Sequence, residues 1–128
     1  MEKIYTWRRL RNYMKTNKNE NDTLLLIPKA QCYIEYMLDV IMKLPRTEKF
    51  NIGNEYKQST YRMLNLIIYL NKADKQKKPE QLNQIDCELN IQRILLRILC
   101  KKHWIDKKKF EVSIEKLRRN RQNFRRAY

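Results

Sequence analysis

The scarcity of residues that make turns is the feature of this sequence that most limits its fold. Its 128 residues include one glycine, Gly53, and three prolines, Pro28, Pro45 and Pro79. A fold of many strands needs a turn every few residues, and glycine and proline supply much of the chemistry of turns. The sequence therefore predicts an all-α protein with long helices and few connections.

Apolar residues recur at helical spacing in four segments, which predicts four helices. The first covers residues 29–44, with Pro28 where the first turn of a helix tolerates proline. The second covers about 52–72 and the third about 79–103, and the fourth follows Asp106, a predicted N-cap. Four amphipathic helices with short links predict an antiparallel four-helix bundle.

The connection between the first two predicted helices contains Pro45 and Gly53. Pro45 disfavours the helical conformation at Leu44, so we expect the first helix to end there. We expect Phe50 and Ile52 to cover the end of the bundle. Gly53 is expected to allow a close backbone approach or a positive φ near the start of the second helix.

Positive charge exceeds negative charge and is concentrated near the ends of the chain. The sequence has 29 Lys and Arg against 14 Asp and Glu, a net charge of +15. Residues 107–128 alone carry nine cations against two anions, a net charge of +7. An excess of this size attracts polyanions, nucleic acids among them.

The C-terminal segment interleaves arginine with aromatic residues, a pattern typical of binding to unpaired RNA. Its apolar stripe is interrupted at Arg121, and an arginine on a packing seam is costly unless it is paired or exposed. Either the bundle ends near Leu117 and the rest projects, or Arg121 lines an open channel or contact site. The predicted nucleic-acid-binding residues here are Lys107, Lys108, Lys109, Arg118, Arg119, Arg121, Phe124, Arg125, Arg126 and Tyr128.

Residues 1–24 are predicted to form a basic leader, separate from a bundle and basic tail formed by residues 25–128. Arg8, Arg9 and Arg11 are further candidates for RNA contact. The leader also has the pattern of a basic amphipathic helix for a membrane surface, or of a segment that docks on a protein partner. No stretch is apolar for long enough to be a signal peptide or a membrane span, so we expect a cytoplasmic protein with no membrane partner.

No constellation of residues in the sequence indicates catalysis, a metal site or a cofactor. The single histidine, His103, is expected to have a surface or capping role. Cys32, Cys87 and Cys100 are widely spaced and form no C-x-x-C pair. This spacing favours reduced, buried thiols over disulfides or a zinc site. We therefore expect a protein that is not an enzyme.

The apolar surface of the second and third predicted helices is wider than one small bundle can bury. In the third helix, Ile91, Ile94 and Ile98 extend the apolar face well past a third of the circumference. A helix that is apolar nearly all round is buried on more than one side, so the sequence predicts self-association. The alternative is a monomer with an unusually apolar surface.

Two stretches resemble known small bacterial four-helix-bundle proteins. PKAQCYIEYMLDVIMKLPRTEKFNIGNEY is similar to the first helix and turn of two groups, the 23S rRNA intervening-sequence proteins and the accessory variability determinant (Avd) proteins of diversity-generating retroelements. IDCELNIQRILLRILCKKHWID resembles the Avd pattern D-x-x-L-x-x-x-R-x-L-L-R-L. STYRMLNLIIYLNKA lacks the proline and glycine that the intervening-sequence proteins carry in their second helix, which favours Avd. The positions that match are Pro45, Arg46 and Gly53 in the turn and Asp86, Leu89, Arg93, Leu95, Leu96 and Arg97 in the third helix.

The resemblance covers roughly residues 28–118 and implies a function. Avd proteins are pentameric barrels of four-helix-bundle protomers that partner a reverse transcriptase and the template RNA of the retroelement in making error-prone cDNA. Asp86, Arg93 and Arg97 share one stripe, which is either a solvated polar face or an ion-pair seam between protomers, and the resemblance puts the seam on an equal footing. The alternative function is a free-standing RNA- or ribosome-binding protein of the intervening-sequence type.

Overall fold

The computed structural model describes the backbone of residues 18–127 and the side chains of residues 25–126. This part of the chain contains helices and no strand, as the sequence predicts. None of these helices has the length and apolar content needed to cross a membrane. The long helices are α2 (Lys18–Met42), α4 (Ile52–Lys72), α5 (Lys78–Lys101) and α6 (Lys107–Ala127), and the short one is α3 (Arg46–Phe50).

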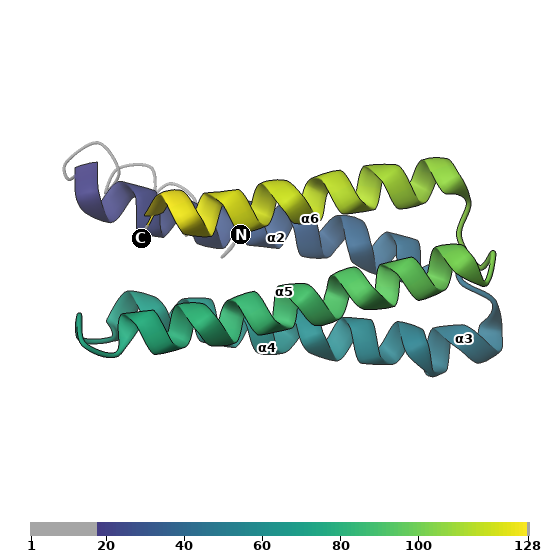
Figure 1. Cartoon of the computed structure of the whole chain (residues 1–128), viewed down its shortest axis with the longest axis horizontal. Coiled ribbons are helices and arrows are strands. Elements are labelled where there is room, and N and C mark those ends of the chain that lie inside the picture. The colour runs from purple at the N-terminus through teal and green to yellow at the C-terminus, as the bar shows by residue number, and fades with distance from the viewer. Residues whose placement is uncertain (1–17, 128) are drawn as a thin grey trace, which may run out of the picture.

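The four long helices form a bundle of two antiparallel pairs. α2 and α6 lie side by side in the upper half of Figure 1, and α4 and α5 lie side by side in the lower half. α2 also packs on α4, and α5 on α6, so each long helix has two neighbours. This up-and-down order brings the start of α2 and the end of α6 to the same end of the bundle (Figure 1).

One apolar core joins the four long helices. Met37 of α2, Met63 of α4 and Leu96 of α5 are fully buried, and Leu117 of α6 is 4% exposed. Each such side chain contributes roughly 1.5–3 kcal/mol relative to leaving it in water. The stripes at 3- and 4-residue spacing that predict the helices therefore mark the faces that the bundle buries.

The first helix starts earlier than predicted. α2 begins at Lys18, so Pro28 lies inside the helix and not in its first turn. The helix also runs through residue 24, where the basic leader was predicted to end. A proline inside a helix removes one backbone hydrogen bond and costs about 3 kcal/mol. Leu26 and Ala30, on either side of Pro28, are 2% and 0% exposed. Packing of these residues against the bundle offsets that cost and keeps the helix continuous.

The turn after α2 contains a short helix that the apolar spacing of the sequence does not predict. The N–H of Leu44 donates to the carbonyl of Ile41 at 3.1 Å, and Pro45, with φ −53° and ψ 145°, is the N-cap of α3. α2 ends at Met42, two residues before the predicted end at Leu44. The expectation that Phe50 covers the bundle end is wrong, because α3 buries none of its residues and Phe50 is 69% exposed. Ile52, half-buried, does pack against the core.

Gly53 is needed for space and not for a left-handed backbone. A Cβ atom here would lie 3.1 Å from Ile41 Cγ2, 3.2 Å from Leu44 Cδ1 and 3.2 Å from the carbonyl oxygen of Glu48. Its φ is not positive. Of the two predicted reasons for this glycine, the close approach is confirmed and the positive φ is wrong.

His103 caps α5 and turns the chain into α6. It has a φ of 62°, and its N–H donates to the carbonyl of Cys100 at 3.0 Å. The N–H of Trp104 donates to the carbonyl of Leu99, also at 3.0 Å. These two bonds form a Schellman motif, which usually has glycine in the left-handed position. The predicted surface or capping role of His103 is confirmed.

The cysteines are free, and their predicted burial is mostly wrong. Cys32 on α2 and Cys87 on α5 are exposed, while Cys100 is half-buried. Cys32 and Cys87 fall outside the buried stripes of their helices, so neither thiol reaches the core.

Candidate nucleic-acid interface

α6 begins with three lysines placed against the usual preference of a helix. Asp106 caps the helix, since its Oδ1 accepts the N–H of Lys109 at 2.6 Å, which confirms the predicted N-cap. No acidic residue lies in the first turn. Lys107 and Lys108 are exposed and Lys109 is half-buried. Cations at the positive end of a helix dipole are unfavourable, so helix stability does not explain this cluster.

Two of the C-terminal arginines are paired with one acid on the same helix. Glu115 accepts from Arg118 Nη2 at 2.6 Å and from Arg119 Nε at 3.1 Å. The hydrogen bond from Arg118, with a smaller contribution from Arg119, lowers the pKa of Glu115 to about 2. One carboxylate is shared by two exposed guanidinium groups, so a net positive charge remains at the surface.

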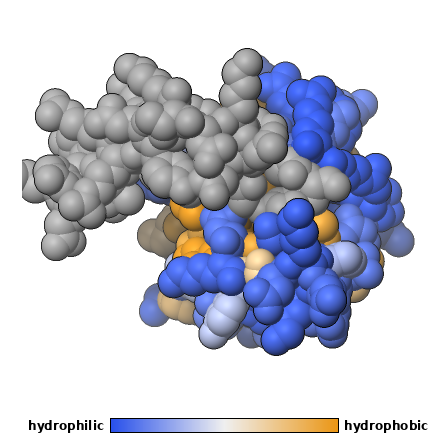
Figure 2. Space-filling view, turned by 90° about the vertical axis from the view of Figure 1, so that its left-hand side faces the viewer, coloured by the Kyte–Doolittle hydropathy of each residue, from blue (hydrophilic) through white to orange (hydrophobic). Residues whose placement is uncertain are grey.

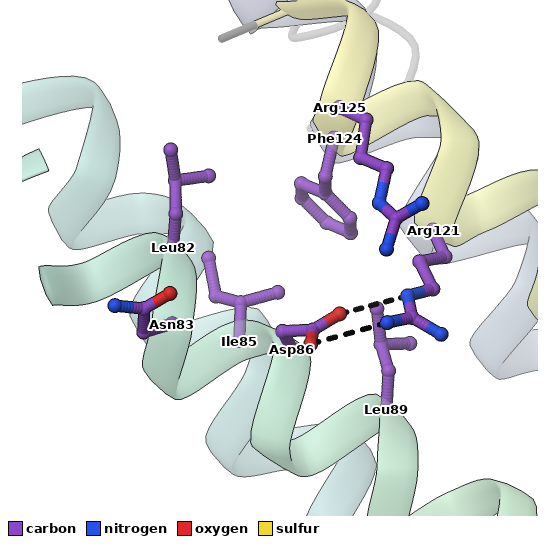
Figure 3. A pocket seen from close by; sticks show the side chains of 8 residues that line it. All are labelled: Leu82, Asn83, Ile85, Asp86, Leu89, Arg121, Phe124 and Arg125. Carbon is purple, nitrogen blue, oxygen red and sulfur yellow. Dashed lines mark hydrogen bonds and ion pairs between the residues drawn. The ribbon is translucent and has the colours of Figure 1, made fainter. Parts of the chain in front are cut away.

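Arg121 lies in a pocket between α5 and α6, where it pairs with Asp86 (Figure 3). Arg121 Nε is 2.8 Å from Asp86 Oδ1 as an ion pair, and Nη2 donates to Oδ2 at 3.3 Å. The Arg121 side chain is 26% exposed and that of Asp86 is 41% exposed. Arg121 interrupts the apolar stripe of α6, and its charge is paired with Asp86 on the neighbouring helix α5. This ion pair explains how an arginine is tolerated on the packing seam.

The bundle does not end near Leu117. Phe124 is 4% exposed and Asn120 is 3% exposed, so α6 stays packed on the core for two further turns. The predicted alternative of a projecting tail is wrong. In this fold the ring of Phe124 is part of the core, where it cannot stack on an RNA base, and it does not belong to the interface.

The remaining predicted contacts are exposed or lie outside the described residues. Arg125 and Arg126 are exposed near the end of α6. Within residues 25–126 neither has an anionic partner. Viewed from this end of the bundle, most of the visible surface is hydrophilic, with small hydrophobic areas between (Figure 2). The predicted contacts outside the described residues are Arg8, Arg9, Arg11 and Tyr128.

The side of α6 that faces α2 carries cations that were not all predicted from the sequence. Lys116 Nζ lies 4.8 Å from the centre of the Tyr36 ring on α2, within the range of a cation–π contact. Lys29 on α2 is also exposed. Lys116, Arg119 and Arg126 recur at steps of three and seven residues, so they follow one stripe of α6. This helical spacing could have identified the three cations in the sequence as one face of α6. The other arginines of the segment are so numerous that the spacing does not stand out.

The residues of the family-like pattern have diverse surroundings. Leu89 is core, at 2% exposure. Arg93 Nη2 donates to Asn90 Oδ1 at 2.9 Å, while its Nε is buried without a hydrogen bond. Arg97 and, on α3, Arg46 are exposed. The charge of Asp86 is matched within the chain by Arg121, so any seam between protomers would rest on the two arginines of α5.

α4 and α5 expose large apolar side chains. On α5, Ile91, Ile94 and Ile98 are 40%, 52% and 38% exposed and lie at steps of three and four residues. On α4, Tyr61 and Tyr69 are 43% and 59% exposed. The apolar width seen in the sequence is therefore present at the surface, where the single chain leaves it unburied.

A hydrogen-bonded polar chain runs through the core between α2, α4 and α5. The hydroxyl of Tyr33 donates to Gln92 Oε1 at 2.7 Å, so the hydroxyl of Tyr56 donates to Tyr33, at 2.5 Å. Gln92 Nε2 then donates to Ser59 Oγ at 3.2 Å, and Ser59 donates to the Glu88 carboxylate at 2.8 Å. Burial raises the pKa of both tyrosines, which keeps them neutral.

The polar chain ends at the surface in an ion pair. Arg62 Nε donates to Glu88 Oε1 at 2.8 Å, and this hydrogen bond raises the pKa of Arg62. Helical spacing in the sequence places Tyr56 in the apolar stripe and does not single out Gln92. A period-3.6 pattern cannot show which buried positions are polar and paired.

The described residues contain no group of three or more His, Cys, Asp or Glu side chains that could hold a metal ion. No curated protein and no solved structure matches the chain. A family model described as bAvd-like matches residues 24–119, which is more than half of the chain. The chain belongs to the bAvd-like family, and so to the accessory variability determinant proteins of diversity-generating retroelements.

Proposed function

We propose that this protein binds the reverse transcriptase and the template RNA of a diversity-generating retroelement and supports mutagenic cDNA synthesis. The family consists of accessory proteins of diversity-generating retroelements, and membership of it supports a role beside the polymerase of such an element. The proposed partners are the polymerase, the RNA and further copies of the same chain, all in the cytoplasm and without a membrane.

The exposed cations of α6 are the observation that carries the RNA part of the proposal. The helix has nine cations and two anions. Lys107 and Lys108 lie at the end of the helix where they destabilise it. Arg125 and Arg126 have no acidic partner among the described side chains. Charge maintained against local stability indicates a function, and a polyanion is the natural ligand for it.

The exposed isoleucines of α5 support self-association, for which we propose a pentamer. Ile91, Ile94 and Ile98 form a ridge that a second copy of the chain would bury. A ring of protomers would also repeat the cations of α6 around the assembly. Several RNA contacts would then act together, which steepens the dependence of affinity on salt.

We also propose that the chain itself performs no catalysis. Glu88 is engaged by Ser59 and Arg62, and Asp86 by Arg121, so these two acids of α5 are held in structural contacts. The backbone N–H of His103 closes the cap of α5, which accounts for this residue structurally. In the proposed division of labour, chemistry belongs to the polymerase.

The experiment is cDNA synthesis by the partner reverse transcriptase on the template RNA of the retroelement, with and without this protein. We expect cDNA to depend on the protein, and RNA binding to weaken steeply as salt rises, by about 0.7 in the log–log slope per phosphate on single strands. Equal cDNA yield without the protein would contradict the polymerase part. RNA binding with no effect on the polymerase would favour a free-standing protein of the intervening-sequence type.

A further inference from the structure

A groove between α2 and α6 combines positive charge with an unpaired buried acceptor. It has a volume of about 560 Å³, within the range of ligand sites in proteins. The residues of this α2/α6 groove that matter here are Lys29, Cys32, Lys116, Arg119, Asn120 and Arg126. Four of them are cations, and none of the described residues that line the groove is acidic. We refer to Lys29, Lys116, Arg119 and Arg126 as the groove cations.

The groove cations come from both walls of the groove. Lys29 is on α2, and the other three lie along the stripe of α6 that faces α2. Lys116 is held over the ring of Tyr36, and Arg119 shares Glu115 with Arg118. A ligand that lies along the groove therefore meets cations on either side, which suits a chain of phosphates better than a single anion.

Asn120 supplies a second and independent feature of the groove. Its side chain is 3% exposed, and its Nδ2 donates to Met63 Sδ at 3.8 Å. Its Oδ1 is buried and accepts no hydrogen bond from the described residues. A buried acceptor without a donor is unfavourable, and a ligand that brings an N–H group would relieve it. A phosphate has no such donor, whereas every nucleobase carries one.

We propose that the α2/α6 groove binds a short single-stranded segment of RNA, with phosphates on the groove cations and one unpaired base turned toward Asn120. This inference rests on the proposed function and assigns its RNA contact to one place. A groove of this size takes one or two nucleotides, and the bases of a duplex, stacked and paired, cannot enter it. The segment is therefore bound with its bases unpaired.

The test compares two variants with equal loss of charge. The groove variant carries Lys29→Gln, Lys116→Gln, Arg119→Gln and Arg126→Gln. The control variant carries Lys43→Gln, Lys72→Gln, Lys75→Gln and Lys102→Gln, all exposed, outside α6 and outside the groove. Each variant loses four positive charges, and glutamine keeps the helix propensity. Circular dichroism and light scattering establish that both keep the fold and the mass of the parent.

Affinity is measured by fluorescence anisotropy with a labelled 12-nucleotide single-stranded RNA and with a duplex of the same length. We expect the groove variant to bind the single strand about tenfold more weakly than the parent or worse. Its salt slope should fall by about 0.7 for each phosphate that the variant no longer neutralises. The control variant should bind about threefold more weakly or less. Equal losses of affinity in the two variants would overturn the inference, because RNA would then respond only to net charge.

Cys32 gives a readout that involves no mutation. It is exposed in the α2/α6 groove, and Cys87 is exposed on α5, away from it. Saturating single-stranded RNA should slow alkylation of Cys32 several-fold and leave the rate at Cys87 unchanged, as followed by mass spectrometry. An unchanged rate at Cys32 would overturn the inference.

The failures of the two proposals are distinguishable. If the parent binds no RNA, the proposed RNA-binding function fails together with the groove. If the parent binds RNA and the groove variant binds it equally well, only the groove assignment fails. If the groove variant keeps its RNA affinity but no longer binds the reverse transcriptase, the groove holds an acidic protein segment, and the inference is overturned.

Discussion

α5 and α6 are neighbouring antiparallel helices of similar length, yet they present opposite surfaces. α5 has four cations and three anions and exposes Ile91, Ile94 and Ile98. α6 has nine cations and two anions, and its only large exposed apolar residue is Val112 within the described part. Their inner faces are alike, since both pack on one core. The bundle is therefore a common frame that carries an apolar outer surface on α5 and a cationic one on α6.

The two helices are joined by an ion pair between Asp86 of α5 and Arg121 of α6 (Figure 3). We propose that the exposed isoleucines of α5 mediate self-association and that the exposed cations of α6 bind RNA. Changing each surface without the other tests their separation.

The largest effect is expected on the apolar surface. Ile94→Glu with Ile98→Glu places two charges on the ridge of α5, where burial in an interface would be costly. We expect the assembly to fall to single chains of 15.9 kDa, measured by light scattering at low micromolar concentration.

Met42→Glu with Val112→Glu is the matched control, because both residues are exposed apolar side chains outside α4 and α5. This control should keep the mass of the parent. A parent mass of one chain, or an unchanged assembly in the Ile94→Glu, Ile98→Glu variant, would show that the ridge is not the interface.

The next effect separates the inner from the outer face of α6. Phe124→Ala removes a core ring and should lower the free energy of unfolding by about 3–5 kcal/mol. Arg126→Ala, two residues away and exposed, should change it by about 0.5 kcal/mol or less. Urea denaturation measures both. Equal small effects would mean that α6 ends near Leu117 after all.

A smaller pair of effects tests which tyrosine hydroxyl donates each hydrogen bond of the polar chain in the core. Tyr33→Phe leaves Gln92 Oε1 and the Tyr56 hydroxyl without partners and should cost about 2–3 kcal/mol. Tyr56→Phe leaves the bond from Tyr33 to Gln92 in place and should cost about 1 kcal/mol. Thermal unfolding monitored by circular dichroism compares them. The reverse order would contradict the assigned donors.

The smallest effect concerns the joint between α5 and α6. His103→Gly should raise the free energy of unfolding by about 0.5–1 kcal/mol, because glycine adopts a φ of 62° without the steric cost that a side chain brings. Lys102→Gly, one residue earlier with φ −82°, is the control and should lower it. A destabilised His103→Gly variant would indicate that the imidazole makes contacts that the cap does not explain.

The sequence predicted the bundle well because its helices are long and their apolar spacing is regular. α4 matches its predicted bounds, and Asp106 and His103 cap helices as expected. Pro28 misled the prediction of α2, because packing of Leu26 and Ala30 overrides a local rule. Local signals place helix ends only where tertiary contacts do not compete with them.

The candidate site was only partly predictable. The charge of α6 was evident from composition, but the groove cations could be grouped only after α2 was placed beside α6. Lys29 is the clearest case, since nothing in its local sequence links it to Arg126. Phe124 was assigned to the RNA interface but is part of the core. The sequence could not distinguish the two roles, because the same helical spacing fits a core ring and a ring that stacks on a base.

The separation of the two surfaces is tested most directly by light scattering of the groove variant with RNA absorbance recorded on the same sample. We expect a protein mass equal to that of the parent assembly and the loss of most of the bound single-stranded RNA. A groove variant that falls apart into single chains, or one that carries as much RNA as the parent, would contradict this expectation.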